Sequence, residues 1–275
     1  KIVIGEDGVQ TGDMDVNAWD LSDTDFDVEF YANDINMGGI TMGTGDILAH
    51  AQDNGVDTGD LTVDGNIDRD EAGTSTLDLR ADQNIYIDTV TIESSTGALN
   101  ITLNSDRDAD EDGKIIVWDS TLTTLGGYFV AGGGDGTIGG TNGILGDGDG
   151  TGADDSFAYA VGSGNGVTLS ASNINTSDGD VVIKGYAKDA GTAWGIFQSQ
   201  SIVTTNDGRI DYTGTSTGDA NYPRGIELSG NDANAARIVT AGGDIVMNGT
   251  ATNSIGFVFY ENSNISTTDG NITIT

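Results

Sequence analysis

Alternating carboxylates make residues 106–119 the segment best suited to metal chemistry. In DRDADEDGKIIVWD, four carboxylates occupy positions 1, 3, 5 and 12 of a calcium loop of the EF-hand type: Asp108, Asp110, Asp112 and Asp119. Gly113 at position 6 allows a sharp turn, and the carbonyl group of Lys114 adds a further oxygen ligand. The flanks have the pattern of strands rather than helices, and position 12 is Asp instead of a bidentate Glu. An acidic, solvated loop between two strands is therefore the alternative to a calcium site.

A second acidic stretch, GDGDGTGADDS, is a weaker candidate for calcium. Its carboxylates lie among glycines that let the backbone wrap around an ion: Asp147, Asp149, Asp154 and Asp155. The periodic GGxGxD pattern of calcium-binding nonapeptide repeats is absent, so a flexible solvated loop is the interpretation we favour. If both loops bind calcium, we expect the ion to stiffen the longest excursions of the chain.

Groups for other catalytic chemistry are scarce. The chain has no Cys, and its sole histidine, His50 in ILAHAQ, is expected to be a packed or surface residue of a strand rather than a general base. A polysaccharide-cleaving protein would need clustered carboxylates, or Arg with calcium, in a groove. We expect no enzyme, and keep a polysaccharide-binding or -cleaving protein as an alternative.

The elements that position these residues are short strands in a repeat. An apolar residue, Thr and a Gly recur in fixed order before an alternating strand, with glycines 29, 35 and 27 residues apart at Gly179, Gly208, Gly243 and Gly270. A second column keeps step at intervals of 29, 30 and 31: Gly166, Gly195, Gly225 and Gly256. Gly97 and Gly127 are 30 apart, and the next interval is 52. We attribute the excess to a loop over residues 132–156 that leaves one coil.

A period of about 30 residues without helical patterning predicts an all-β parallel β-helix, or β-solenoid, in which each repeat is one coil. The whole chain, 1–275, is expected to be one such segment. Period-2 alternation directs these pairs inward: Val181/Ile183, Ile210/Tyr212, Ile245/Met247 and Ile272/Ile274. The framed glycines are expected to permit left-handed or strained corners. For the recurrent Thr, we favour a simple β-former over a hydroxyl ladder or bonds to the turn.

Charge limits the partners. The 44 Asp and Glu outnumber the 10 Lys and Arg, giving a net charge of −34 that repels nucleic acid and anionic lipid. No apolar run approaches the length of a transmembrane helix, so no membrane insertion is expected in this segment. The acidity suits calcium-bearing or salty surroundings and equally suits simple solubility. The first residue is Lys1 and the last residues form a strand-like run, which suggests a segment of a larger protein.

The runs VTIESSTGALNITLNSD, STLTTLGGYFVAGGG and NISTTDGNITIT resemble the haemagglutinin-type repeats of filamentous-haemagglutinin-like exoproteins and other giant bacterial surface adhesins. The resemblance spans residues 74–275 and implies a right-handed β-helix at the cell surface or outside the cell. It implies a structural or adhesive rod whose partners are neighbouring repeats, other copies of the chain, surface glycans or other cells. The family's amino-terminal secretion domain, with its Asn-Pro motifs, has no counterpart in this sequence, since the only proline is Pro223. The alternative is a self-assembling subunit of a filament or envelope layer, formed by end-to-end stacking.

Overall fold

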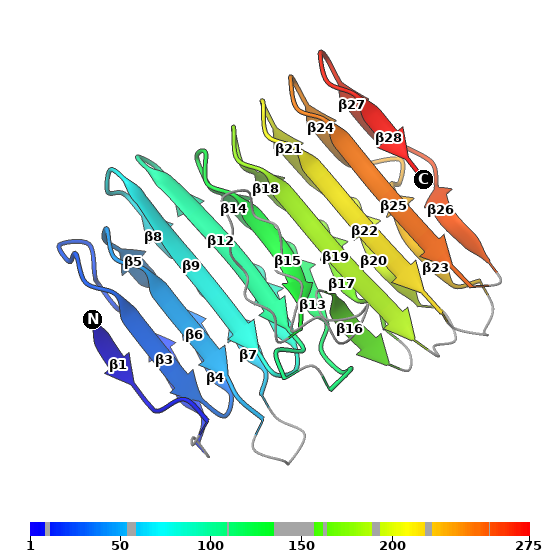
Figure 1. The fold of residues 1–275 in the computed structure, drawn as a ribbon. Helices are drawn as coiled ribbons and strands as arrows, with labels where there is room; N and C mark the ends of the chain where they lie inside the picture. Colours follow the sequence, from blue (N-terminus) through cyan, green and yellow to red (C-terminus); the bar gives the residue numbers. More distant parts are fainter. Residues whose placement is uncertain are drawn as a thin grey trace.

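The computed structural model describes residues 1–8, 12–53, 59–108, 110–134, 157–161, 164–188, 193–217, 222–252 and 254–275. Three parallel sheets wind around one axis, and Figure 1 shows their strands stacked in chain order from the N-terminus at one end to the C-terminus at the other. Within the described ranges, no helix is long and apolar enough to cross a bilayer. The predicted all-β parallel solenoid is confirmed.

Sheet A has eleven strands, of which ten stack in one row. They are β1 (Ile2–Ile4), β3 (Val28–Ala32), β6 (Ile47–Ala51), β9 (Thr74–Ala81), β12 (Ala98–Ser105), β15 (Phe129–Gly133), β19 (Val181–Lys188), β22 (Ile210–Ser216), β25 (Ile245–Ala251) and β28 (Ile272–Ile274), with β16 (Ala158–Val161) beside β19. At ~4.8 Å per strand, the row is about 43 Å long.

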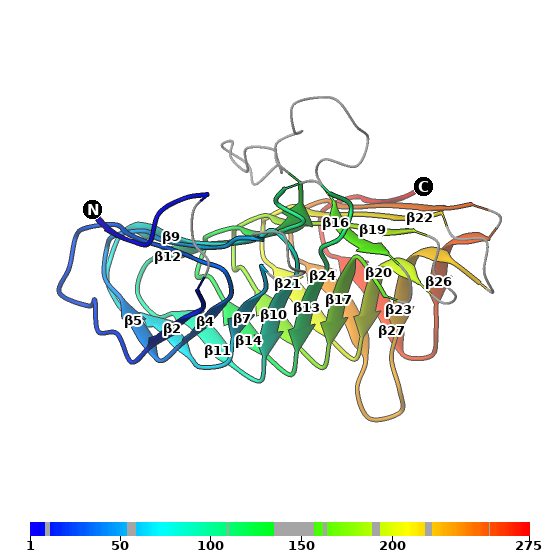
Figure 2. The same ribbon diagram turned by 90° about the horizontal axis from the view of Figure 1, so that it is seen from below.

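Sheets B and C complete each coil, as Figure 2 shows from below. Sheet B contains β2 (Met14–Asn17), β4 (Ile35–Gly38), β7 (Leu61–Val63), β10 (Ile85–Asp88), β13 (Ile115–Trp118), β17 (Val167–Ser170), β20 (Trp194–Ser199), β23 (Arg224–Ser229) and β26 (Ile255–Phe259). Sheet C contains β5 (Ile40–Met42), β8 (Ile67–Arg69), β11 (Thr91–Ser94), β14 (Thr121–Thr123), β18 (Asn173–Asn175), β21 (Ile202–Thr205), β24 (Ala236–Thr240) and β27 (Ser263–Thr267). The chain passes through A, B and C in turn.

The strand register reproduces the intervals of the repeat. In sheet C, Ile174 pairs with Val203, Val203 with Ile238 and Ile238 with Ile265, which are steps of 29, 35 and 27 residues. The long step of 52 also appears, because Leu122 pairs directly with Ile174. The predicted excursion lies in that step. Its first residues, Gly132 and Gly133, end β15 instead of leaving the coil, and residues 135–156 are outside the described part of the chain.

Alternation along each strand builds one apolar interior. Three of the four predicted inward pairs have no exposed surface: Val181/Ile183, Ile210/Tyr212 and Ile245/Met247. Ile272 and Ile274 are each 44% exposed, because β28 has a neighbouring strand on one side only. Full burial of such a side chain contributes roughly 1.5–3 kcal/mol, so the stack is held mainly by this continuous ladder.

The framed glycines are required by close stacking. A Cβ atom at Gly208 would lie 2.1 Å from the carbonyl oxygen of Gly179, and one at Gly179 would lie 2.0 Å from that of Gly127. The prediction of left-handed glycines at this corner was wrong in its reason. The left-handed residue of the turn is Ser177, with φ of 56°, two positions before Gly179. Glycine therefore serves the approach of one coil to the next rather than the turn itself.

A column of buried hydroxyl groups satisfies these turns. Thr176 Oγ1 donates to the carbonyl oxygen of Gly179 at 2.6 Å, and Thr205 Oγ1 donates to that of Ser177 at 2.7 Å. Thr205 Oγ1 also accepts the backbone N–H of Gly208 at 3.1 Å. The interpretation of these threonines as simple β-formers is therefore incomplete. Each hydroxyl replaces water for a turn that the next coil covers.

Candidate functional site

The loop between β12 and β13 brings three carboxylates together. Asp106, Asp108 and Asp110 each place an oxygen within 4.8 Å of the others. Two of the four predicted ligands are therefore in the group, while Asp112 lies outside it. Asp119 follows Trp118 at the far end of β13, ~13 Å of strand away from the loop.

The strand explains why the twelve-residue frame does not close around one point. Ile115 and Val117 are fully buried, so the chain enters sheet B at Ile115. The carbonyl oxygen of Lys114, predicted as a ligand, accepts the backbone N–H of Ile85 at 2.9 Å instead. The second half of the frame is thus committed to the sheet, and only the first half forms a loop.

Asp106 is the residue that the sequence reasoning missed. It is 3% exposed, and its Oδ1 accepts backbone N–H groups from Glu111 at 3.1 Å and from Asp112 at 3.3 Å. Gly113 closes the loop against it, since a Cβ there would lie 2.2 Å from the Asp106 nitrogen. The available signal was the alternation of acids itself, which begins at Asp106 rather than at Asp108.

The environment of the loop disfavours three negative charges. Burial, together with the nearby Asp110 and Asp108 carboxylates, raises the pKa of Asp106 to about 8, against the opposing effect of the two backbone N–H groups. Burial, then Asp110 and Asp82, raises the pKa of Asp108 to about 6. Above these values the loop carries excess negative charge, which a proton or a cation would relieve.

The donor set is suited to calcium. Two oxygens bound to one Ca²⁺ at ~2.4 Å can be at most about 4.8 Å apart, and the three carboxylates meet that limit. Three oxygens are about half of a calcium shell, so carbonyl groups or water would supply the rest. Within the described residues, no other group of three His, Asp or Glu is this close. The second predicted set, Asp147, Asp149, Asp154 and Asp155, lies outside the described residues.

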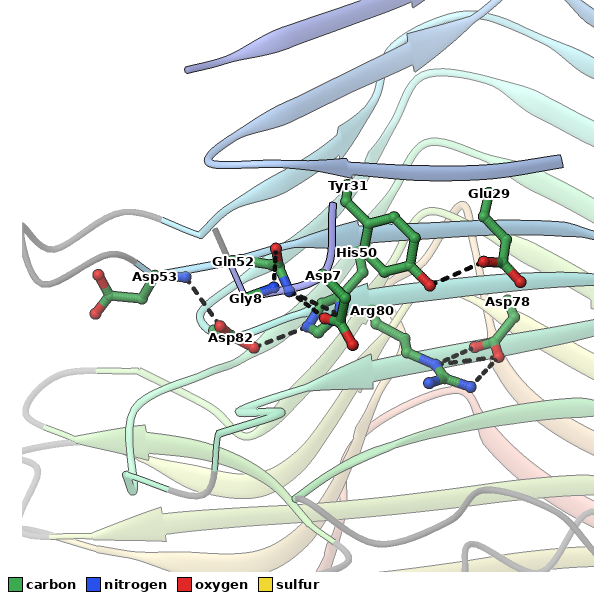
Figure 3. A network of polar contacts seen from close by, with 10 residues as sticks. All are labelled: Asp7, Gly8, Glu29, Tyr31, His50, Gln52, Asp53, Asp78, Arg80 and Asp82. Carbon is green, nitrogen blue, oxygen red and sulfur yellow. Dashed lines mark hydrogen bonds and ion pairs between the residues drawn. The ribbon is translucent and has the colours of Figure 1, made fainter. Parts of the chain in front are cut away.

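The histidine lies in a different polar network, drawn in Figure 3, on the outer face of sheet A. His50 is half-buried on β6, in register between Tyr31 on β3 and Arg80 on β9. Its Nε2 is 2.9 Å from Asp82 Oδ1, and its Nδ1 is 3.7 Å from Asp7 Oδ1. The predicted placement on a strand is confirmed.

That network joins the turn after β1 to the next coils. Gln52 Nε2 donates to Asp7 Oδ1 at 2.5 Å, and Gln52 Oε1 accepts the backbone N–H of Gly8 at 3.0 Å. Asp82 Oδ2 accepts the backbone N–H of Asp53 at 2.9 Å. These contacts make His50 and Gln52 links between turns of successive coils.

Comparison with known proteins gives no relative. No family model, no curated protein and no solved structure matches the chain. Functional inference therefore depends on the residues and on their geometry.

Proposed function

We propose that this chain is a shaft segment of an extracellular rod with a structural and adhesive role. The observation that carries the proposal is the unbroken stacking of coils, in which sheet A runs from β1 to β28 and sheets B and C accompany it. In such a solenoid each coil contacts only its neighbours, so added coils lengthen the rod without enlarging its cross-section. The resemblance to haemagglutinin-type repeats supports the same role.

The surface charge agrees with this role. A net charge of −34 keeps a long rod solvated and separated from nucleic acid and anionic lipid. In this proposal the chain supports and presents binding surfaces and does not catalyse a reaction. Any binding is expected where loops leave the regular coil.

Calcium is the cofactor that we propose for the loop from Asp106 to Asp110. Bound there, the ion would neutralise charges that burial makes costly and would fix the connection between sheets A and B. Its function would be to stiffen the shaft near its middle rather than to activate a substrate.

The test of the rod is its shape and its location. Negative-stain electron microscopy of the parent protein should show a straight shaft, and an antibody against this chain should label the outside of intact source cells. The purified chain should be a particle about 43 Å long along the coil axis by small-angle scattering. A compact particle, or labelling only after cell lysis, would contradict the proposal.

A self-assembling filament is the second candidate. The last coil exposes Ile255, Phe259, Ile272 and Ile274, each between 44% and 53%, and its strands have one open edge. Coils of another copy could stack on that edge. Fibres that lengthen with protein concentration would favour this candidate, and isolated rods at all concentrations would favour the shaft.

A further inference from the structure

The outer face of sheet C carries a polar cleft where one coil departs from the period. The step from Val203 to Ile238 is 35 residues, and the extra residues form the loop 230–235 between β23 and β24. Figure 2 shows this loop projecting from the side of the solenoid near β23 and β27. Together with β24 and β27 it encloses about 570 Å³, within the size range of small-ligand sites.

The loop is held in place by its own hydrogen bonds. Asn231 Oδ1 accepts the backbone N–H groups of Ala233 at 2.9 Å and of Asn234 at 2.7 Å. Asn262, on the following coil, donates from Nδ2 to the carbonyl oxygen of Asn231 at 2.8 Å. A cleft whose wall is fixed before binding loses little conformational entropy when a ligand enters.

The floor of the cleft presents Arg237 in an acid-rich protein. Arg237 on β24 lies beside Asn264 on β27, and both side chains are exposed. Lys1, Arg80 and Arg209 each pair with a carboxylate. In the described part of the chain, the Arg237 guanidinium makes no such pair and no hydrogen bond.

The lining indicates the class of ligand. Its polar groups are mostly amides and hydroxyls, from Asn231, Asn234, Asn264 and Ser266, with the Arg237 guanidinium and the Asp232 carboxylate. Planar amide, guanidinium and carboxylate groups form paired hydrogen bonds with neighbouring hydroxyl groups. The lining contains no aromatic side chain and only Ala and Val as apolar residues, which makes the cleft a poor site for an apolar ligand.

We propose that this cleft binds a sugar unit of a surface glycan, with Arg237 and Asn264 hydrogen-bonding its hydroxyl groups or a sugar carboxylate. The inference rests on the adhesive part of the proposed function and names its ligand class. Nucleic acid is disfavoured because its regular phosphate charges would meet the field of a chain with a net charge of −34.

Calorimetric titration of the intact chain against defined oligosaccharides tests the proposal. The probes are tetramers of glucose, galactose and N-acetylglucosamine, which are neutral, and a tetramer of galacturonate. Arg237→Ala and Asn264→Ala should each weaken binding about tenfold or more, because each removes a donor on which the ligand's hydroxyl groups depend. Weakening confined to galacturonate and sensitive to salt would identify a sugar carboxylate as the group bound by Arg237.

Trp118→Ala is the matched control. Trp118 is 52% exposed in a separate groove on sheet B, with Tyr86 and Ile116. Unchanged binding in this variant is expected, and each variant must keep the thermal midpoint of the parent. Binding that is lost only in Trp118→Ala, or no binding to any probe, would overturn the cleft proposal. Electron microscopy and surface labelling would still test the rod, so the two failures can be distinguished.

Discussion

Replacement of Asp106 by Asn should stabilise the calcium-free protein, although it removes a buried carboxylate that accepts two hydrogen bonds. Asn keeps an oxygen for the backbone N–H groups of Glu111 and Asp112. Its new N–H₂ group faces the oxygens of Asp108 and Asp110, which accept hydrogen bonds. The variant therefore loses a charge in an unfavourable place and keeps its packing.

The magnitude follows from the pKa of Asp106. A rise from 3.8 to about 8 means that the folded chain holds a proton that the unfolded chain has released between these pH values. The stability of the native state therefore falls as pH rises through this window, by ~1.4 kcal/mol per pH unit. The destabilisation is about 1.6 kcal/mol at pH 5, roughly 5 kcal/mol at pH 8, and constant above that. Below pH 3.8 it disappears.

Thermal unfolding at pH 5 and pH 8, with EGTA or with excess calcium, measures the effect. In EGTA at pH 8, Asp106→Asn should unfold about 10 °C above the parent, and the gap should shrink at pH 5. Calcium should raise the midpoint of the parent at pH 8 and leave that of Asp106→Asn nearly unchanged, because a ligand has been removed.

Asp119→Asn is the matched control, since Asp119 is exposed at the other end of β13 with φ of 44°, a conformation that Asn tolerates well. It should keep the calcium response and the pH dependence of the parent. A lower midpoint for Asp106→Asn at pH 8 in EGTA would refute the electrostatic reasoning. Loss of the calcium response in Asp119→Asn would restore the twelve-residue loop that the strand geometry argues against.

Two further predictions concern the stacked turns. Thr176→Val should cost about 1–3 kcal/mol in urea unfolding, because the buried carbonyl oxygen of Gly179 loses its donor, whereas Thr204→Val, outward-facing and half-buried, should cost less than 1 kcal/mol. Gly208→Ala should cost about 3 kcal/mol or more, since its Cβ would meet a backbone carbonyl oxygen at 2.1 Å; Gly164→Ala, whose nearest contact would be 3.5 Å, should be tolerated. Equal costs within either pair of variants would be evidence against the stacking argument.

The period of the coil was readable from the sequence because stacking makes it visible. Each coil must repeat an apolar pair and a glycine at the point of closest approach, so intervals of 29, 35 and 27 residues reappear as strand register. The first coils escaped detection for a physical reason as well. In the hydroxyl column, Met42 and Arg69 stand where later coils have Ser or Thr, although the strands pair in the same way.

The composition of the acidic site could not be read in the same way. A motif gives the spacing of carboxylates along the chain, whereas the start of a strand decides which of them stay in the loop. Burial of Ile115 and Val117 moves Asp119 away, and the end of β12 at Ser105 places Asp106 at the loop's base. Sequence reasoning found two of the three clustered carboxylates because these two lie between the strand ends.

The intervals of the repeat also carried a signal that points to the sugar cleft. Against neighbours of 29 and 27, the 35-residue step from Gly208 to Gly243 marks an insertion as surely as the step of 52 does. A coil tolerates extra residues only where they leave the stack, and residues that leave the stack are free of its packing constraints. The insertion at 230–235 used that freedom for asparagines that fix its shape and face Arg237. In a solenoid, therefore, the length of each interval is as informative about binding surfaces as the residues within it.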